Sequence, residues 1–149
     1  MYAKIMVAID GGSVAMRALD EAIRMAQRQG ADLILVHVIE YPHIYVPDLG
    51  YDPAAITEAL LNDGKRILAK AESLVKAGRI GYRSLLINER NSFDSIAGQL
   101  QKLADEHDAD LVVLGTHGRG GYKRLLLGSV AEEFLRSSRR PVLLIPGKA

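Results

Sequence analysis

The strongest restriction on the fold of this chain comes from the way two kinds of apolar segment alternate along it. Short apolar runs at residues 3–9, 33–39, 79–87, 110–115 and 141–146 have the length and the Ile and Val content of strands that are buried on both faces. Longer stretches between them repeat their apolar residues every three or four positions, which is the period of a helix packed on one face. The order β-α-β-α-β-α-β-α-β predicts an α/β fold: an open parallel five-stranded sheet with helices on both faces and right-handed crossovers.

Capping residues and glycines predict where the helices lie. The first helix is expected to run from Val14 to a stop at Gly30, and the second over residues 56–75, where Gly64 costs about 1 kcal/mol relative to alanine. Ser92 is expected to cap the third helix. A short fourth helix is expected to turn one apolar side to the core, made of Ala131, Phe134 and Leu135.

Composition narrows the class of protein. A chain of 149 residues predicts one domain over residues 1–149. The absence of cysteine excludes disulfides, thiol nucleophiles and cysteine metal sites. Lys and Arg number 19 against 18 Asp and Glu, so the formal net charge of +1 does not favour nucleic acid or a membrane surface as a partner. The apolar run at residues 3–9 is too short for a signal segment or a membrane span, and we expect a cytoplasmic protein.

A glycine-rich segment follows the fourth strand and reads GTHGRGGYKRLLLGS over residues 115–129. In sheets of this kind, ligands bind beyond the carboxyl ends of the strands, where the strand order reverses. Glycine lets the backbone approach an anion closely, and Gly128 and Ser129 at a helix start would add unpaired N–H donors. Spacing alone leaves two interpretations open: a phosphate cradle, or a turn and loop followed by an ordinary helix cap.

Other phosphate-binding patterns do not fit. The segment lacks the GK[ST] ending of a P-loop, and the turn Asp10-Gly11-Gly12-Ser13 is not the GxGxxG of a dinucleotide fold. A phosphoacceptor receiver domain would need paired acidic residues after the first strand, where Asp10 is followed by two glycines. A Walker-type NTPase, a classical dinucleotide fold and a receiver domain are therefore disfavoured.

The segment does fit the pattern G-x2-G-x9-G-[ST] at Gly115, Gly118, Gly128 and Ser129. With this motif the chain resembles the ATP-binding members of the universal stress protein family. The resemblance extends over essentially the whole chain, from the opening VAID-G through DLVVLGTHGR and LLLGSVA to the closing PVLLIP. It implies a Rossmann-like fold of the adenine nucleotide alpha hydrolase-like kind. One departure is Gly12, where relatives commonly have Ser or Thr.

The resemblance also implies roles for single residues, and ATP, with Mg²⁺, as the ligand. Asp10 would lie near the ribose and phosphates and could hold phosphate through Mg²⁺. Ala8 would flank the nucleotide, the backbone of Val38 would meet the adenine edge, and Val130 would continue the phosphate cradle. A turn-forming aspartate before two glycines is the alternative for Asp10.

The chemistry of the charged and polar residues in and near the glycine-rich segment indicates which of them could contact phosphate. Arg119 lies nearest the proposed cradle in sequence and is the preferred cationic contact for phosphate. His117 could donate to phosphate or act as a base, with a solvated loop histidine as the alternative. His37, inside the second strand, is expected to be a core or sheet-edge residue rather than a ligand, and no spacing of His, Asp and Glu indicates a protein-only metal site.

No nucleophile stands beside an oriented base in the sequence, so ATP binding with slow or no turnover is the leading interpretation. The bound nucleotide would then change stability and the choice of an unknown protein partner, as in a regulator or stress-survival factor. A slow ATPase or autophosphorylating protein, using Asp10 with Mg²⁺ and the hydroxyl of Thr116 or Ser129, is the enzymatic alternative. A nucleotide-free dimeric scaffold is the third.

The last strand, PVLLIP at residues 141–146, is expected at an edge of the sheet. Its centre carries no charge, and unpaired N–H and C=O groups at such an edge invite another chain. We therefore expect a homodimer through the C-terminal strand. A monomer whose last strand is shielded by a long loop at residues 40–55 is the alternative.

Overall fold

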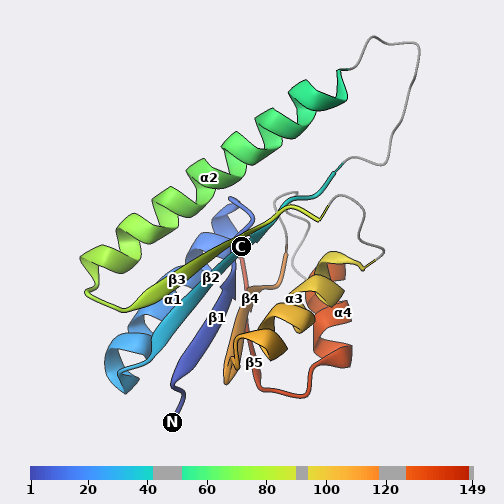
Figure 1. Ribbon diagram of the computed structural model, residues 1–149. Helices are drawn as coiled ribbons and strands as arrows, with labels where there is room; N and C mark the ends of the chain where they lie inside the picture. The colour runs from blue at the N-terminus through green and yellow to red at the C-terminus, as the bar shows by residue number, and fades with distance from the viewer. Residues whose placement is uncertain (42–51, 90–93, 118–126, 148–149) are drawn as a thin grey trace.

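The computed structural model describes residues 1–41, 52–89, 94–117 and 127–147, and the strands in these ranges form one parallel sheet. The strands are β1 (Lys4–Ala8), β2 (Asp32–Val38), β3 (Tyr82–Ile87), β4 (Leu111–Gly115) and β5 (Val142–Ile145). Their order across the sheet is β3-β2-β1-β4-β5 (Figure 1). The predicted α/β fold with an open five-stranded parallel sheet is confirmed.

Helices cover both faces of the sheet, as the sequence predicts. They are α1 (Ser13–Gln29), α2 (Pro53–Ala77), α3 (Ile96–Glu106) and α4 (Ser129–Ser137). Helices α1 and α2 pack on one face and α3 and α4 on the other, so the sheet lies between two apolar layers (Figure 1). None of the helices in the described ranges is long and apolar enough to cross a membrane.

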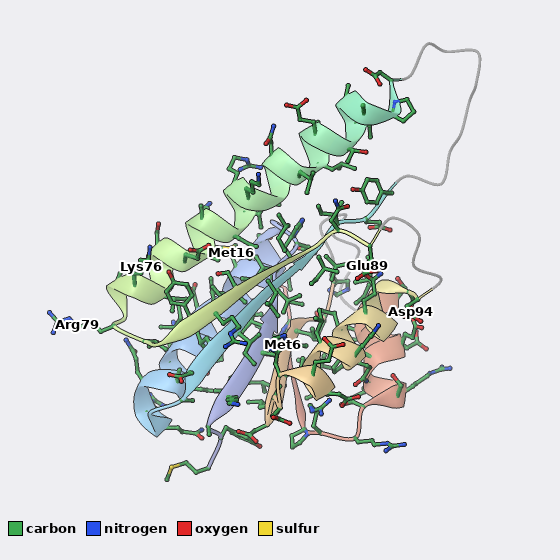
Figure 2. All side chains as sticks on the ribbon, in the orientation of Figure 1. Met6, Met16, Lys76, Arg79, Glu89 and Asp94 are labelled. Atoms are coloured by element: carbon green, nitrogen blue, oxygen red, sulfur yellow. The ribbon has the colours of Figure 1, made fainter. Side chains whose placement is uncertain are left out.

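The continuous apolar runs of the strands follow from this three-layer arrangement. In β1, Ile5 and Val7 pack toward α1 and α2, whereas Met6 between them packs toward α3 and α4. Figure 2 shows Met6 inside the molecule, and Lys76 and Arg79 pointing away from it. A strand buried on both faces has no polar side to display, which is why these runs do not alternate.

Helix α1 ends where the sequence predicts, whereas helix α2 begins earlier than predicted. Helix α1 stops at Gly30, whose φ of 69° is left-handed as a glycine cap requires. Helix α2 begins at Pro53, earlier than predicted, because the Asp52 carboxylate accepts from the Ala54 N–H at 3.0 Å. Residues 53–55, which were predicted to be the end of a loop at residues 40–55, are therefore helical. Residues 42–51 of that predicted loop lie outside the described ranges.

The prediction that Ser92 caps the third helix is wrong. Helix α3 is capped by Ser95, whose hydroxyl accepts from the Gly98 N–H at 3.1 Å and donates to the Glu133 carboxylate at 2.7 Å. The second bond ties the start of α3 to α4. Residues 90–93, with Ser92 among them, lie outside the described ranges.

The predicted inner side of the fourth helix needs one correction. Ala131 and Phe134 of α4 are buried, but Leu135 is 46% exposed. Successive helix residues point about 100° apart, so with Phe134 at the centre of the buried face Leu135 turns to the side.

Gly64 explains how closely α2 lies on the sheet. A Cβ built on Gly64 would come 2.7 Å from Leu86 Cδ1 and 3.0 Å from His37 Cδ2. No side chain fits there without movement, so the mid-helix glycine allows α2 to pack directly on β2 and β3.

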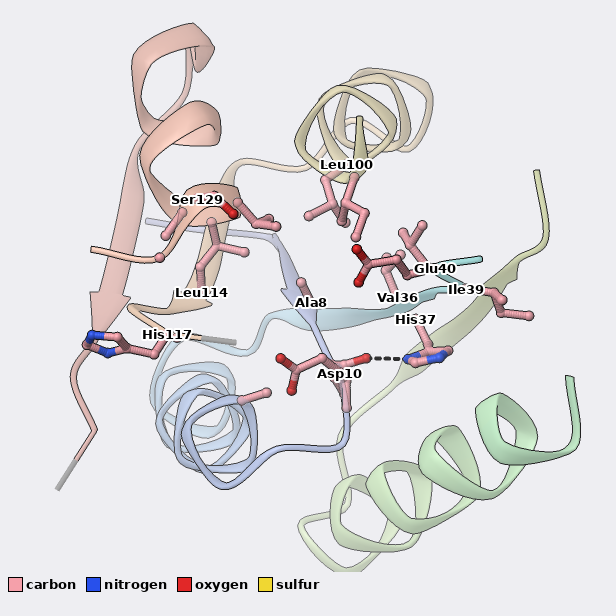
Figure 3. Close-up of a pocket in the computed structure, with 18 of the residues that line it drawn as sticks. Ala8, Asp10, Val36, His37, Ile39, Glu40, Leu100, Leu114, His117 and Ser129 are labelled. Carbon is pink, nitrogen blue, oxygen red and sulfur yellow. Dashed lines mark hydrogen bonds between the residues drawn. The ribbon is translucent and has the colours of Figure 1, made fainter. Parts of the chain in front are cut away.

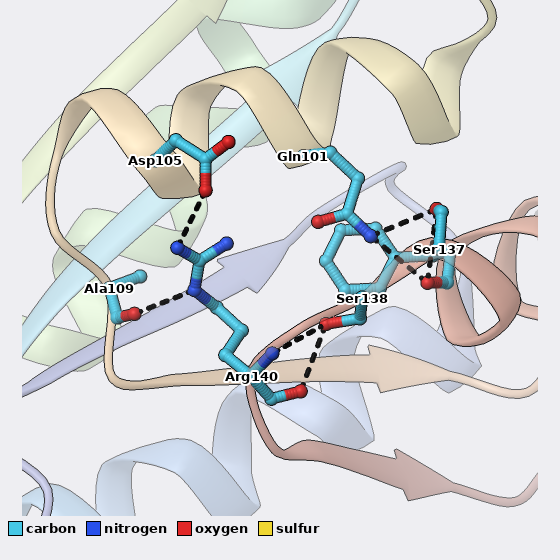
Figure 4. A network of polar contacts seen from close by, with 7 residues as sticks. Gln101, Asp105, Ala109, Ser137, Ser138 and Arg140 are labelled. Carbon is cyan, nitrogen blue, oxygen red and sulfur yellow. Dashed lines mark hydrogen bonds and ion pairs between the residues drawn. The ribbon is translucent and has the colours of Figure 1, made fainter.

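A polar network holds α4 and β5 against α3 (Figure 4). The guanidinium of Arg140 donates from Nε to the Ala109 carbonyl at 2.8 Å and pairs with the Asp105 carboxylate at 2.7 Å. The Gln101 amide donates to the Phe134 carbonyl and to the Ser137 hydroxyl, both at 3.0 Å. These contacts fix the far end of α4, and thereby the direction in which its first turn points.

Candidate functional site

A pocket of about 450 Å³ opens at the carboxyl edge of the sheet. The ends of β1, β2 and β4 form its floor, and α2, α3 and α4 contribute to its walls (Figure 3). It lies between β1 and β4, where the chain order reverses from β1-β2 on one side to β4-β5 on the other. This switch point is the place where α/β sheets of this type bind ligands.

Every candidate residue within the described ranges lines this one pocket, although the candidates come from distant parts of the chain. They are Ala8, Asp10, Val38, Gly115, His117, Gly128, Ser129 and Val130. The remaining two candidates, Gly118 and Arg119, lie outside the described ranges. The pocket therefore joins the ends of β1 and β2 to the segment around the start of α4.

The start of α4 presents backbone donors at the pocket. Gly128 is the N-cap residue, and as a glycine it provides no side-chain oxygen to cap the first-turn N–H groups after it. The Gly128 N–H itself donates to the Thr116 carbonyl at 2.6 Å, which brings the two ends of the glycine-rich segment together. An uncapped helix start with its positive dipole end is suited to an anion.

Gly115 has a packing reason for being glycine. A Cβ on Gly115 would lie 2.7 Å from Val14 Cγ1 and 3.2 Å from the Val14 backbone carbonyl carbon. Close approach of α1 to the end of β4 therefore accounts for Gly115 without reference to phosphate. The same residue still lines the pocket.

Asp10 forms a turn and also lines the pocket. Its Oδ1 accepts from the Gly12 N–H at 2.8 Å, and Gly11 between them has a φ of 86°, so the carboxylate forms the turn into α1. The carboxylate also lines the pocket, and Figure 3 shows it beside Ala8. Turn formation holds the side chain where a ligand would meet it.

His117 has one ring nitrogen paired and one unpaired. Its Nδ1 lies 2.9 Å from the Thr116 hydroxyl oxygen. Its Nε2 is buried without a hydrogen-bond partner in the part of the chain that the structure describes. His117 also lines the pocket, so this buried and unpaired ring nitrogen belongs to a residue of the site.

The family model of the universal stress protein family matches residues 1–146. The chain belongs to this family. Universal stress protein YxiE of Bacillus subtilis is 30% identical over 97% of this chain and 99% of its own length. The crystal structure of a universal stress protein family member from Burkholderia pseudomallei is 34% identical, with a TM-score of 0.81 over 98% of this chain and 97% of that one.

Two similar universal stress protein structures contain nucleotides. The protein from Archaeoglobus fulgidus in complex with dAMP is 26% identical, with a TM-score of 0.66 over 97% of this chain and 98% of that one. A universal stress protein in complex with cAMP is 27% identical, with a TM-score of 0.64 over 97% of both chains. Both ligands are adenine nucleotides.

The sequence analysis did not predict that α2 contributes to this pocket. Leu60 and Asp63 of α2 line it, as does Glu40 after β2. The signal that was present is Gly64, because a glycine in mid-helix indicates close approach to another element. His37 was expected in the core, and it is buried, but it also lines the pocket.

No group of three or more His, Asp or Glu side chains that could hold a metal ion occurs in the described ranges. Asp10 is a single carboxylate, so any Mg²⁺ beside it would need further oxygens from a ligand and from water. Mg²⁺ commonly binds nucleotides in this manner.

Proposed function

We propose that the chain binds an adenine nucleotide, ATP with Mg²⁺, in the pocket at the carboxyl edge, and that it acts as a nucleotide-dependent regulator in stress survival. One observation carries the proposal: a cavity at the switch point, lined by both apolar and polar residues, joins the end of β2 to the start of α4, whose N-cap residue Gly128 has no capping side chain. Such a cavity has one end suited to a base and another suited to phosphates. The adenine nucleotides in two related structures support the choice of base.

Each part of ATP has a matching group in the pocket. The base would lie between Ala8 and the backbone of Val38, the ribose near Asp10, and the phosphates at Gly128 and Ser129. The Asp10 carboxylate with phosphate oxygens and water supplies the oxygen ligands that Mg²⁺ prefers. Bound Mg²⁺ would neutralise phosphate charge.

Regulation by occupancy follows from binding alone. A ligand that binds the folded chain stabilises it by RT ln(1 + [L]/Kd), about 2.7 kcal/mol at a hundredfold excess over Kd. A partner that distinguishes the filled pocket from the empty one would then respond to nucleotide concentration. Slow or absent turnover suits this role, because the ligand must persist to be recognised.

One observation favours a second candidate function, slow autophosphorylation. The Thr116 hydroxyl is paired with His117 Nδ1, and both residues line the pocket. In this reaction Thr116 Oγ1 would attack the γ-phosphorus, the bond to the leaving ADP would break, and the hydroxyl proton would pass to His117. Incubation with ATP and Mg²⁺ followed by mass spectrometry distinguishes the two, because phosphate on Thr116 appears only under the second.

Calorimetric titration with ATP and GTP tests the proposal. We expect ATP to bind more tightly than GTP, and we expect Ser129→Asp to abolish binding, because a carboxylate at the first turn of α4 repels phosphate. The same charge favours the helix dipole, so the free energy of unfolding should hold or rise by up to about 1 kcal/mol.

The matched control is Ala54→Asp, which adds an acid to the exposed first turn of α2, outside the pocket lining. It should bind ATP like the wild type. Equal affinity for ATP and GTP would remove adenine from the proposal, and full ATP binding by Ser129→Asp would show that phosphate does not bind at α4.

A further inference from the structure

The hydrogen-bond ladder between β1 and β2 stops one step early, beside the pocket. Its paired register ends at Ala8 and Val36, after which the Ile9 N–H still donates to the Val36 carbonyl at 2.8 Å. In a parallel ladder the next bond would run from the Val38 N–H to the Ile9 carbonyl. Among the described residues that bond is not made.

The side chain of His37 takes the place of the missing bond. His37 Nδ1 lies 2.6 Å from the Ile9 carbonyl oxygen (Figure 3). A carbonyl can only accept, so Nδ1 carries the hydrogen and donates it. The Ile9 carbonyl is thus satisfied by a side chain, and the Val38 N–H is not needed there.

The backbone of Val38 faces the pocket as a result. Val38 is the register partner of Ile87 in β3, and the bonds to Ile87 come from its neighbours, as the Ile39 N–H shows at 2.9 Å from the Ile87 carbonyl. The N–H and C=O of Val38 therefore point the other way, toward the side where β1 has ended. Since Val38 lines the pocket, a donor and an acceptor lie side by side at its wall.

We propose that His37 is a positioning residue for base recognition: by occupying the Ile9 carbonyl, it keeps the Val38 amide open to the ligand. The inference rests on the proposed function and extends it to base selectivity. Adenine presents an amino donor beside a ring acceptor, which matches the C=O and N–H of Val38. Guanine presents an acceptor beside a donor on the same edge, in the opposite order.

Packing from α2 holds the imidazole in this position. His37 is 9% exposed, and its Cδ2 edge faces Gly64, where even a Cβ would approach to 3.0 Å. The side chain of Leu86 in β3 also lies against Gly64, where a Cβ would approach its Cδ1 to 2.7 Å. With an apolar residue at 37, the buried Ile9 carbonyl would lose its donor, and the nearest backbone donor in the ladder is the Val38 N–H. The ladder would then close and remove the Val38 N–H from the ligand.

The first test needs no nucleotide. Amide hydrogen exchange of the ligand-free full chain, followed by NMR, should find Val38 exchanging faster than Ile39 in the wild type. His37→Leu should slow Val38 exchange by roughly tenfold. His37→Asn should exchange like the wild type, because its side-chain amide nitrogen can replace Nδ1. Protection of Val38 in the wild type would overturn the inference even if no variant folds.

The second test reads base selectivity. His37→Leu should weaken ATP binding by roughly fivefold, the effect of one backbone hydrogen bond, and leave GTP affinity nearly unchanged. His37→Asn should restore the ATP-to-GTP ratio. The matched control is Leu86→Ala, which loosens packing at the same ring without removing the donor, and which should lower stability but preserve the ratio.

The outcomes separate the inference from the proposed function. If the wild type binds neither nucleotide, the proposed function fails, while the exchange result still reports on His37. If the wild type prefers ATP and His37→Leu keeps the same ratio, the proposed function stands and the positioning role of His37 is overturned. Equal losses for ATP and GTP would reduce His37 to a packing residue.

Discussion

Asp110 joins the start of β4 to the start of β1 through its side chain. Its carboxylate accepts from the N–H groups of Ala3 and Lys4, both at 2.9 Å. These backbone bonds, from Lys4 first and then from Ala3, hold the pKa of Asp110 below its usual value. The Asp110 N–H also donates to the Lys4 carbonyl at 2.8 Å, so one residue secures the alignment of both strands.

The lowered pKa of Asp110 predicts a pH-dependent contribution to stability. A carboxylate with a depressed pKa stabilises the fold fully above its unfolded value of about 3.9 and loses that contribution as the pH falls through the folded pKa. Because the group is exposed, we expect Asp110→Asn to lower the free energy of unfolding at pH 7 by less than about 1 kcal/mol.

Urea unfolding of wild type and Asp110→Asn at pH 7 and below pH 4 measures this contribution. The difference between the two proteins should shrink at the acidic pH. Asp20→Asn, which removes a charge from an exposed position on α1, is the control. A difference of the same size at both pH values would contradict the assigned cause.

Single residues could be interpreted from sequence where their effect is local. Gly30 ends α1 because the residue at that position has a left-handed backbone conformation, which glycine adopts readily. A glycine between a helical pattern and a strand pattern therefore predicts the end of the helix. The effect of His37 is not local, because its ring reaches across to the carbonyl of Ile9 on another strand. Nothing in the residues around position 37 indicates that contact.

At the scale of elements, helix α2 shows most clearly what local sequence contains and what it lacks. The pair Asp52-Pro53 is a standard helix start, and the structure uses it, so the earlier beginning of α2 was readable from residues. The position of α2 over β2 and β3 was not, because it depends on which helix face meets the sheet. Figure 1 shows the first part of α2 running beyond the sheet.

Gly64→Ala should test how closely α2 packs. Alanine is the better helix former by about 1 kcal/mol, so helix propensity alone would raise stability. The added methyl would instead meet Leu86 Cδ1 at 2.7 Å and His37 Cδ2 at 3.0 Å. We expect overpacking to dominate and to lower the free energy of unfolding by about 1 to 3 kcal/mol, measured by urea unfolding.

Ser73→Ala in the exposed part of α2 is the control for helix propensity. Its hydroxyl donates to the Ala69 carbonyl of the same helix at 3.1 Å and makes no other side-chain bond among the residues that the structure describes, so we expect the variant to be neutral or up to about 0.5 kcal/mol more stable. If Gly64→Ala is stabilised as well, α2 does not press on the sheet as the contacts at Gly64 indicate.

For the whole molecule, the parallel sheet was predictable because strands that alternate with helices pair in parallel, with their carboxyl ends at one edge, whereas the order of the strands across the sheet was not predicted. The same rule placed the glycine-rich segment and Asp10 at one edge, and the structure brings them together there. The contribution of α2 to the pocket was not predictable, since it depends on the packing of layers.

The strand order leaves β3 and β5 as the two edges of the sheet. Strand β3 carries the exposed Arg83, a charge of the kind that discourages edge pairing. Strand β5, with the sequence VLLI, carries no charge and is only half-buried. The predicted homodimer is therefore expected at β5, and the backbone bonds of β5 indicate how to test it.

Leu144→Pro should convert this dimer to a monomer while leaving the sheet intact. Pro141 and Ile145 accept from Val112 and Thr116 of the β4 side, so the odd-numbered residues of β5 bond inward and Leu144 turns its N–H to the open edge. Proline removes that outward donor and spares the inner ladder. Leu144→Ala loses the same side chain but keeps the N–H, so we expect it to remain a dimer in light scattering at micromolar concentration. Circular dichroism would confirm that both variants fold. If the wild type is a monomer, or if Leu144→Pro still dimerises, β5 is not the interface, and the Arg83 edge or a helical face must be tested instead.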